Sequence, residues 1–173
     1  TVVEIFAELG WQTLQSDQIV RDLLMSHGDV RAEIFERWGD EVLNSEDGSI
    51  NRKAIAEIVF QDSDELNWLE ALLHPKVRNI WESSLSPDPA ETVLVEIPLL
   101  FEKSLETAFD LTVCVSSPLD IVSGRMLQRG YSKADIQRRI NRQLPLDEKI
   151  MRADYVLSNA GSLQFLNKQV YRL

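Results

Sequence analysis

VLVEIPLLFE, residues 93–102, is a run of apolar β-formers that is interrupted by an acid, Glu96, and then by a proline, Pro98. Consecutive apolar β-formers suit a strand that is buried on both faces, as in a parallel sheet covered by helices. Pro98 cannot continue the hydrogen-bond ladder, so the strand should end near the acid. Parallel α/β sheets bind their ligands at the carboxyl ends of the strands, and we therefore expect Glu96 to face a crevice.

Strand and helix patterns alternate along most of the remaining chain. Further strand patterns are centred near residues 13, 113 and 156, and helical patterns separate them. This alternation predicts an α/β fold with a parallel sheet and right-handed crossovers. The region of about residues 27–85 has almost no strand signal, so we expect a helical insertion after the first of these strands. Much of the positive charge falls in one short stretch, residues 125–152, which could form a basic lid. A core, a helical insertion and a basic lid are together typical of a small-molecule kinase.

Capping residues and prolines indicate where several helices begin and end. Ser16-Asp17 and Ser117-Pro118 each precede a helical pattern, as does Ser132. Residues 62–65 resemble a capping box and should open a helix that stops at His74-Pro75, because the residue before a proline disfavours helical geometry. A second helix can then begin at Pro75.

Composition restricts the class of protein. The 173 residues carry a formal net charge of −10, which argues against a protein that coats nucleic acid, because that task needs a broad basic face. No apolar stretch is long enough to cross a bilayer and no export signal is evident, so we expect a cytoplasmic protein without membrane contact. The single cysteine, Cys114, lies in a strand pattern and receives no chemical role. Oligomeric state does not follow from the sequence.

Seven short motifs occur along the chain: Ser16-Asp17 with Arg21, then DGSINR (47–52), LLHP (72–75), IPLLFE (97–102), QLP (143–145), ADY (153–155) and NAG (159–161). In this order and spacing they resemble the dephospho-coenzyme A kinase family over nearly the whole chain. The resemblance implies a parallel-sheet phosphate-loop NTPase fold, similar to that of nucleoside monophosphate kinases. It also implies transfer of a phosphoryl group from ATP, with Mg²⁺, to the ribose 3′-hydroxyl of dephospho-coenzyme A, the final step of coenzyme A synthesis.

The resemblance divides the chain into three functional parts. Residues 1–26, 86–120 and 146–173 would form the nucleotide-binding core. Residues 27–85 would form a helical subdomain that binds the acceptor, and residues 121–145 would form a lid.

One part of the family pattern is not found in the sequence. In the family, a glycine-rich loop that cradles the ATP phosphates lies directly before the residue matched by Thr1. The sequence instead opens inside a helical pattern, without a methionine. We therefore expect the intact protein to carry this loop and the central strand that leads into it, since a sheet without that strand has a gap in its ladder.

The resemblance also implies roles for single residues. Asp17 would accept the proton of the acceptor hydroxyl, although Gln15 replaces an acid that is usual two residues before it. Arg21 and His74 would hold the acceptor. Glu96 would position magnesium through water. The other candidates are pocket walls at Leu99 and Phe101, a catalytic Arg125, and nucleotide contacts at Thr1, Arg129, Arg139, Asn159 and Gly161.

The arginines of the expected lid are the candidates for contact with the triphosphate. Arg125 and Arg129 share a helical face, and Arg139 and Arg142 follow on the next helix, so two short rows can converge over a triphosphate. Planar guanidinium groups match the charge that spreads over the oxygens of a transferring phosphoryl group.

Each candidate also has a plainer interpretation. Asp17 can be a helix N-cap, His74 a residue packed at a helix end, and Asn159-Gly161 an ordinary turn, while charged helix faces are usually just solvated. At the level of the whole protein, the alternatives are another phosphate-loop kinase for a nucleoside or small alcohol, and a non-catalytic module that binds coenzyme A or a nucleotide.

Overall fold

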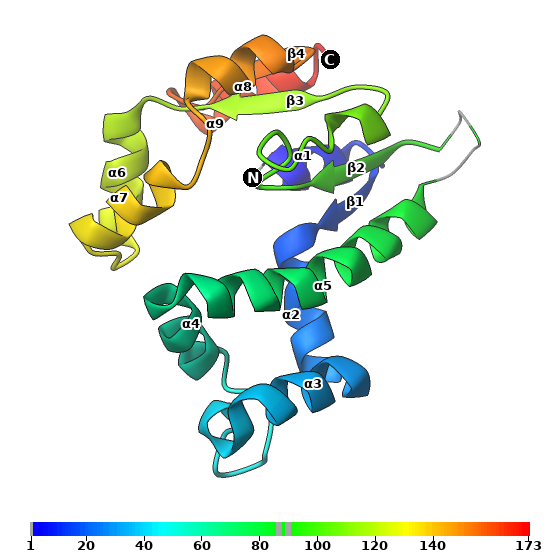
Figure 1. Cartoon of the computed structure of the whole chain (residues 1–173). Coiled ribbons are helices and arrows are strands. Elements are labelled where there is room, and N and C mark those ends of the chain that lie inside the picture. The colour runs from blue at the N-terminus through cyan, green and yellow to red at the C-terminus, as the bar shows by residue number, and fades with distance from the viewer. Residues whose placement is uncertain (1, 86–87, 89–90) are drawn as a thin grey trace. The chain divides into compact units, whose positions relative to one another are not determined.

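The computed structural model describes residues 2–85, 88 and 91–173, and these residues form two compact units. Unit 1 consists of the first ten residues and Pro98–Leu173, and unit 2 of Trp11–Ile97. Figure 1 shows the elements of both. The predicted division into core, acceptor subdomain and lid is a functional one and stays a prediction.

Unit 2 contains the strand that the VLVE sequence predicted. Strand β2 (Val93–Glu96) pairs in parallel with β1 (Gln12–Gln15), and the register runs from Gln12 opposite Val93 to Gln15 opposite Glu96. The three apolar residues of β2 are half-buried and Glu96 is exposed, so the expected burial on both faces is not seen. The reason is that β2 has one strand neighbour, β1, within the described residues.

Unit 1 contains the second parallel pair, β3 (Val113–Ser116) with β4 (Tyr155–Ser158). Asp154 fixes the start of this pair, because its carboxylate accepts hydrogen bonds from the backbone N–H of Thr112 at 2.8 Å and from the Thr112 hydroxyl at 2.7 Å. These bonds, the hydroxyl's first, lower the pKa of Asp154. The four predicted strand positions and their parallel direction are confirmed, and the described strands form two separate pairs, one in each unit.

The other described elements of unit 2 are helices, apart from an isolated bridge between Leu43 and Ile50, and the helical region predicted for residues 27–85 is confirmed. The helices are α2 (Ser16–Ser26), α3 (Gly28–Trp38), the 3₁₀ helix η1 (Gly39–Val42), α4 (Arg52–Gln61) and α5 (Ser63–Ser84). Their buried residues recur at four-residue spacing, which places them on one helix face: Val30 and Ile34, Ile55 and Val59, and Leu69, Leu73, Val77 and Trp81.

The prediction that a helix stops at His74 is wrong. Helix α5 continues through Pro75 to Ser84. A proline inside a helix removes one backbone hydrogen bond, but the buried stripe of α5 continues on both sides of it, at Leu73 and Val77. Packing of this stripe therefore outweighs the local preference.

The start of α5 is predicted correctly in part. Asp62 is the N-cap and accepts a hydrogen bond from Asp64 N–H at 2.8 Å. Glu65, expected to complete the capping box, instead accepts hydrogen bonds from Arg37 and Trp38 at the end of α3. The Glu65 carboxylate therefore binds side chains of another helix and does not complete the capping box of α5.

The helices of unit 1 are α1 (Val2–Glu8), η2 (Glu106–Ala108), α6 (Leu119–Gln128), α7 (Lys133–Asn141), α8 (Leu146–Arg152) and α9 (Leu163–Val170). Helix α1 packs against α9, and α8 against β3. The capping box of Ser132 and Asp135 at the start of α7 is confirmed. Ser117 does not cap α6, because Pro118 occupies the N-cap and the Ser117 hydroxyl bonds to Asn159.

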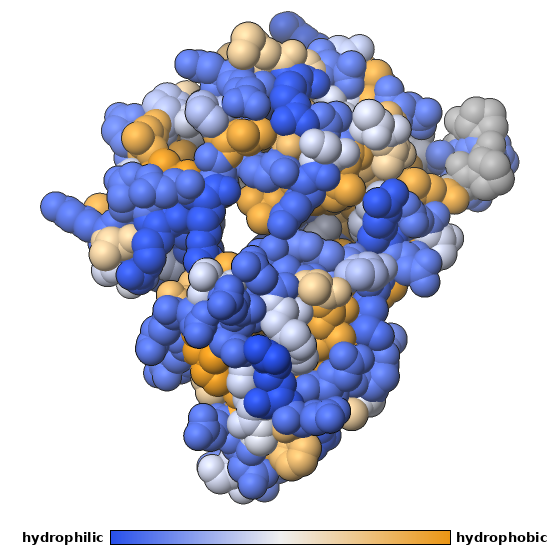
Figure 2. All heavy atoms as spheres, viewed as in Figure 1, coloured by the Kyte–Doolittle hydropathy of each residue, from blue (hydrophilic) through white to orange (hydrophobic). Residues whose placement is uncertain are grey.

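One face of the molecule can be seen as a space-filling surface. Figure 2 shows a visible face on which hydrophilic residues predominate and apolar residues are scattered. Over the part of the chain that the structure describes, no helix has the length and apolar character needed to cross a membrane.

Candidate active site

Two carboxylates gather at the carboxyl end of the β1-β2 pair. Glu96 is the last residue of β2 and lies opposite Gln15, the last residue of β1. Asp17, two residues after Gln15, lies in the first turn of α2. Desolvation and the negative charge of Asp17 raise the pKa of Glu96. The two acids are therefore close enough to repel each other, at the sheet edge where parallel strands place their ligands.

Asp17 is not the N-cap of its helix. Gln15 occupies the cap position, and Asp17 is the second residue of α2 with an exposed side chain. An acid in a first turn is favoured by the positive end of the helix dipole. The plainer interpretation of Asp17 as a cap is thus not seen, and its catalytic role stays a prediction.

Ser16, between the strand and Asp17, is a site feature that the sequence reasoning missed. Ser16 is 9% exposed, and its hydroxyl has no hydrogen-bond partner among the described residues. A buried polar group without a partner is costly. The Ser16-Asp17 motif indicates a helix start and contributes to the family resemblance, but it does not indicate that the Ser16 hydroxyl is buried.

The predicted acceptor residues are divided between the two units. Arg21 lies one turn after Asp17 on α2, and His74 lies on α5, which packs against α2. Both side chains are exposed. Leu99 and Phe101 belong to unit 1, where Leu99 is half-buried and Phe101 is buried beneath the guanidinium of Arg152, 5.4 Å from the ring centre.

The predicted catalytic Arg125 and the predicted nucleotide contact Asn159 meet in unit 1. Arg125, on α6, donates a hydrogen bond from Nη2 to the carbonyl oxygen of Asn159 at 3.1 Å. Asn159 directly follows β4, and β3 ends at Ser116. This contact lies at the carboxyl end of the β3-β4 pair, where the predicted lid begins.

Of the other nucleotide candidates, Arg129 follows Arg125 by one turn, and its backbone N–H donates a hydrogen bond to the Arg125 carbonyl oxygen at 3.2 Å. Arg129 caps the end of α6 and is exposed. The guanidinium of Arg139 lies 4.8 Å from the centre of the Tyr131 ring. Gly161 is exposed, and a Cβ there would lie 3.3 Å from Phe165 Cδ1, so the Phe165 ring would have to move slightly to admit a side chain. Thr1 lies outside the described residues.

Comparison with known proteins decides the family. The family model described as "Dephospho-CoA kinase" matches residues 1–164. The chain belongs to the dephospho-CoA kinase family. The resemblance carried by the seven motifs, and the fold class it implied, are therefore confirmed.

Curated dephospho-CoA kinases resemble the chain over almost its whole length. The protein of Aquifex aeolicus is 33% identical over 174 residues, which cover 100% of this chain and 88% of the relative. That of Leptospira interrogans is 34% identical over 171 residues, covering 98% and 82%. Among solved structures, a Thermus thermophilus protein matches with a TM-score of 0.79 and 32% identity, and the dephospho-CoA kinase from Campylobacter jejuni with 0.70 and 25%; each match covers 99% of this chain and 87% of the other.

In this member of the dephospho-CoA kinase family, the carboxylates at the end of the β1-β2 pair are the type of ligand that hard cations prefer. Asp17 and Glu96 lie at one strand end, and Ser16 is the sequence neighbour of Asp17 there. Within the described residues there is no cluster of three or more His, Cys, Asp or Glu side chains that could enclose a metal. A cation held there would therefore need water and substrate oxygens to complete its coordination shell, as Mg²⁺ commonly does.

Proposed function

We propose that the protein transfers the γ-phosphoryl group of ATP to the 3′-hydroxyl of the ribose of dephospho-coenzyme A. The hydroxyl oxygen bonds to the γ-phosphorus, the bond from that phosphorus to the β,γ-bridging oxygen breaks, and ADP leaves with coenzyme A as the other product. The match to the dephospho-CoA kinase family over residues 1–164 carries this proposal. It favours this reaction over a different phosphate-loop kinase and over a non-catalytic binding module.

Asp17 serves as the base in this proposal. Its carboxylate is exposed in the first turn of α2, at the carboxyl end of β1. A base must reach the hydroxyl whose proton it takes, and this strand end is the position that parallel sheets offer to a substrate. Phosphoryl transfer depends mainly on positioning and charge, so Asp17 also orients the hydroxyl.

Mg²⁺ would be held by Glu96 through water, with Asp17 and the Ser16 hydroxyl beside it. When bound, the ion neutralises charge on the phosphate oxygens. Its positive charge would also favour the ionised form of Glu96, whose pKa is raised by desolvation and by Asp17. An ion held by Glu96 would thus reduce the repulsion between the two acids.

Arg21 and His74 would hold the acceptor from α2 and α5. Both are exposed on helices that pack together within unit 2. Leu99 is the better candidate for a pocket wall, because Phe101 is 5% exposed and covered by Arg152.

Arg125, Arg129 and Arg139 would contact the triphosphate from the lid, and Asn159 and Gly161 would lie beside the adenine. The hydrogen bond from Arg125 to the Asn159 carbonyl supports a common site for these two groups. A guanidinium anchored in this way loses less freedom when it binds phosphate.

Release of ADP from ATP tests the proposal, with dephospho-coenzyme A, nucleosides and small alcohols compared as acceptors. We expect ADP and coenzyme A to form together with dephospho-coenzyme A alone. Equal turnover of a nucleoside would instead indicate another kinase, and ATP binding without any ADP release would indicate a binding module.

A further inference from the structure

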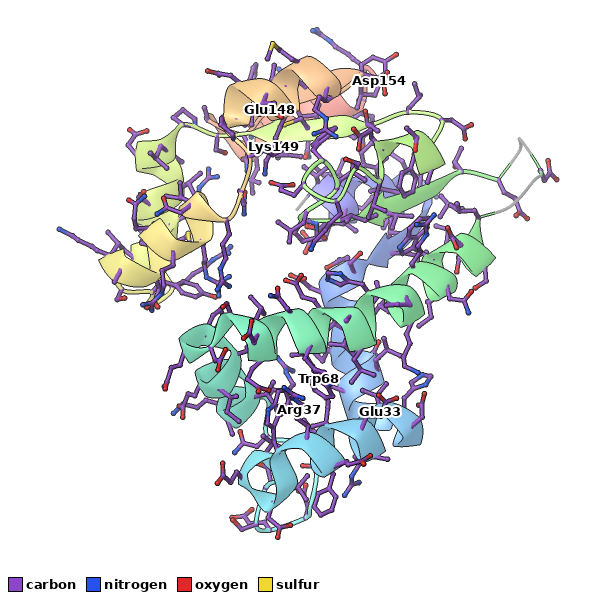
Figure 3. The ribbon with its side chains drawn as sticks, in the orientation of Figure 1. Glu33, Arg37, Trp68, Glu148, Lys149 and Asp154 are labelled. Atoms are coloured by element: carbon purple, nitrogen blue, oxygen red, sulfur yellow. The ribbon has the colours of Figure 1, made fainter. Side chains whose placement is uncertain are left out.

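Glu102, the last residue of the IPLLFE motif, forms a largely buried ion pair with Lys149 of α8. Oε1 and Nζ are 2.6 Å apart, and the two side chains are 11% and 12% exposed. The second oxygen, Oε2, is buried without a hydrogen-bond partner in the described part of the chain. Figure 3 labels Lys149 on α8, the helix that packs against β3.

This pair also binds the segment that leads out of the predicted lid. Glu102 Oε1 accepts a hydrogen bond from the backbone N–H of Leu144 at 3.0 Å, and Lys149 Nζ donates one to Gln143 Oε1 at 2.9 Å. Gln143 and Leu144 lie between α7, which ends at Asn141, and α8, which begins at Leu146. The Glu102 carboxylate therefore binds both α8, through Lys149, and the end of the predicted lid, through Leu144.

The charge state of Glu102 suits this role. Burial alone would raise the pKa of its carboxyl, but the hydrogen bond from Lys149, with the Leu144 N–H and the lysine's charge, lowers it overall. The ionised group is stable only while these partners remain, because a buried charge that loses its partner is strongly unfavourable. The position of Gln143 and Leu144 is thereby coupled to the ion pair.

A second ion pair from the same segment provides a contrast. Glu106 binds Arg152, with 3.0 Å between Nε and Oε1, and Arg152 covers the ring of Phe101. Within the described residues, neither Gln143 nor Leu144 bonds to Glu106 or Arg152. This pair attaches α8 to the same loop region without reaching the end of the lid.

We propose that Glu102 is a positioning residue that fixes the end of the lid, so that α7 presents Arg139 to the ATP phosphates in a constant place. The proposal rests on the proposed function, in which Arg139 contacts ATP. Glu102 acts through Lys149, Gln143 and Leu144 and touches neither substrate.

The test compares Glu102→Gln with Glu106→Gln, since each exchanges one carboxylate for an amide of the same shape. We expect Glu102→Gln to raise KM for ATP about tenfold, with a smaller change in kcat, and to speed amide hydrogen exchange in residues 133–144. Glu106→Gln should lower Tm while KM for ATP and exchange in 133–144 stay as in the unmodified protein.

Equal changes in KM for the two variants, or unchanged exchange at Leu144 in Glu102→Gln, would overturn the proposal. If Glu102→Gln does not fold, Gln143→Ala decides, because it keeps the buried pair and removes one of its links to the lid. Faster exchange in α7 would then support the proposal, and unchanged exchange would refute it. Absence of ADP release by the unmodified protein would refute the proposed function, whereas the exchange comparison would still report on whether Glu102 fixes this segment.

Discussion

The guanidinium of Arg125 and the backbone carbonyl of Asn159 are joined by a hydrogen bond of 3.1 Å. The Ser117 hydroxyl donates to the same carbonyl, also at 3.1 Å. One donor precedes α6 and the other lies on it, so this helix is attached to the loop after β4 by two bonds. Helix α6 of the predicted lid and the loop proposed to lie beside the adenine are therefore joined within unit 1 by these two bonds.

Replacement of Arg125 by lysine should reduce kcat by at least about a hundredfold. Lysine keeps the charge but cannot donate to the Asn159 carbonyl and to a phosphate oxygen with one planar group. Steady-state kinetics with varied ATP measures the effect. Lys168→Gln, an exposed cation on α9 of the same unit, is the control and should behave normally; a normal rate for Arg125→Lys would remove Arg125 from the transfer step.

Asp17→Asn should lower kcat by about two to four orders of magnitude, the usual contribution of a general base. ATP affinity should change little, because the amide keeps the shape of the side chain. Turnover assays and ATP titration measure the two quantities. Asp22→Asn, on the same helix and also exposed, is the matched control. Asp17 would have no role as base if both variants turned over alike.

Glu96→Gln should stabilise the protein at pH 7 and reduce its activity. The pKa of Glu96 is raised above its ordinary value of 4.5 by desolvation and by Asp17, so the folded state holds the proton more tightly than the unfolded state. Stability therefore falls as pH rises from about 4.5 through the folded pKa, and glutamine removes this loss. Melting curves at pH 4 and pH 7 should coincide for the two proteins at the lower pH and separate at the higher.

Magnesium should change that comparison. If Glu96 helps to hold the ion, added Mg²⁺ with ATP should raise Tm more in the unmodified protein than in Glu96→Gln, because a ligand stabilises the state that binds it. An equal increase in both proteins would contradict a role for Glu96 in holding magnesium.

Glu102 predicts the opposite pH dependence. Its pKa is lowered below 4.5 by Lys149 and the Leu144 N–H despite burial, so its contribution is present above pH 4.5 and is lost as pH falls through the folded value. Glu102→Gln should cost about 2 kcal/mol at pH 7 and progressively less below pH 4.5. Urea unfolding across this range measures the difference, and a cost independent of pH would show that the charge of Glu102 contributes nothing.

Glu65 should stabilise the helical part of unit 2. It accepts two hydrogen bonds from Arg37 and one from Trp38 Nε1, each at 2.8 Å, and the Trp38 and Trp68 rings are 5.0 Å apart at 75°. Figure 3 labels Arg37 and Trp68 in this region. Glu65→Gln should lower Tm and change the tryptophan fluorescence.

The control for Glu65 is Glu82→Gln at the other end of α5. Glu82 pairs with Arg78 at 2.7 Å, but both side chains are largely exposed, and exposed pairs contribute little. A loss of Tm as large as that of Glu65→Gln would mean that the contacts of Glu65 with Arg37 and Trp38 add no special stability.

Much of the candidate site could be predicted from chain order. The ends of β1 and β2 follow from an apolar run and a proline, so the meeting of Asp17 and Glu96 follows from parallel pairing. The unpartnered hydroxyl of Ser16 could not be anticipated, because burial depends on what packs around the strand end. The bond from Arg125 to Asn159 joins residues 34 positions apart through a backbone carbonyl, which has no sequence signature.

The sequence by itself determined the four strands, the helical region between the first two and the family, because apolar periodicity and motif order are properties of the chain. Tertiary structure alone decided three other features. Helix α5 continues through Pro75 because packing at Leu73 and Val77 outweighs a local preference. Glu65 accepts hydrogen bonds from Arg37 and does not complete the capping box of α5. Glu102 pairs with Lys149 and accepts a hydrogen bond from the Leu144 N–H. The partner of a carboxylate is set by distances in the folded structure. The spacing of residues along the chain does not specify these distances.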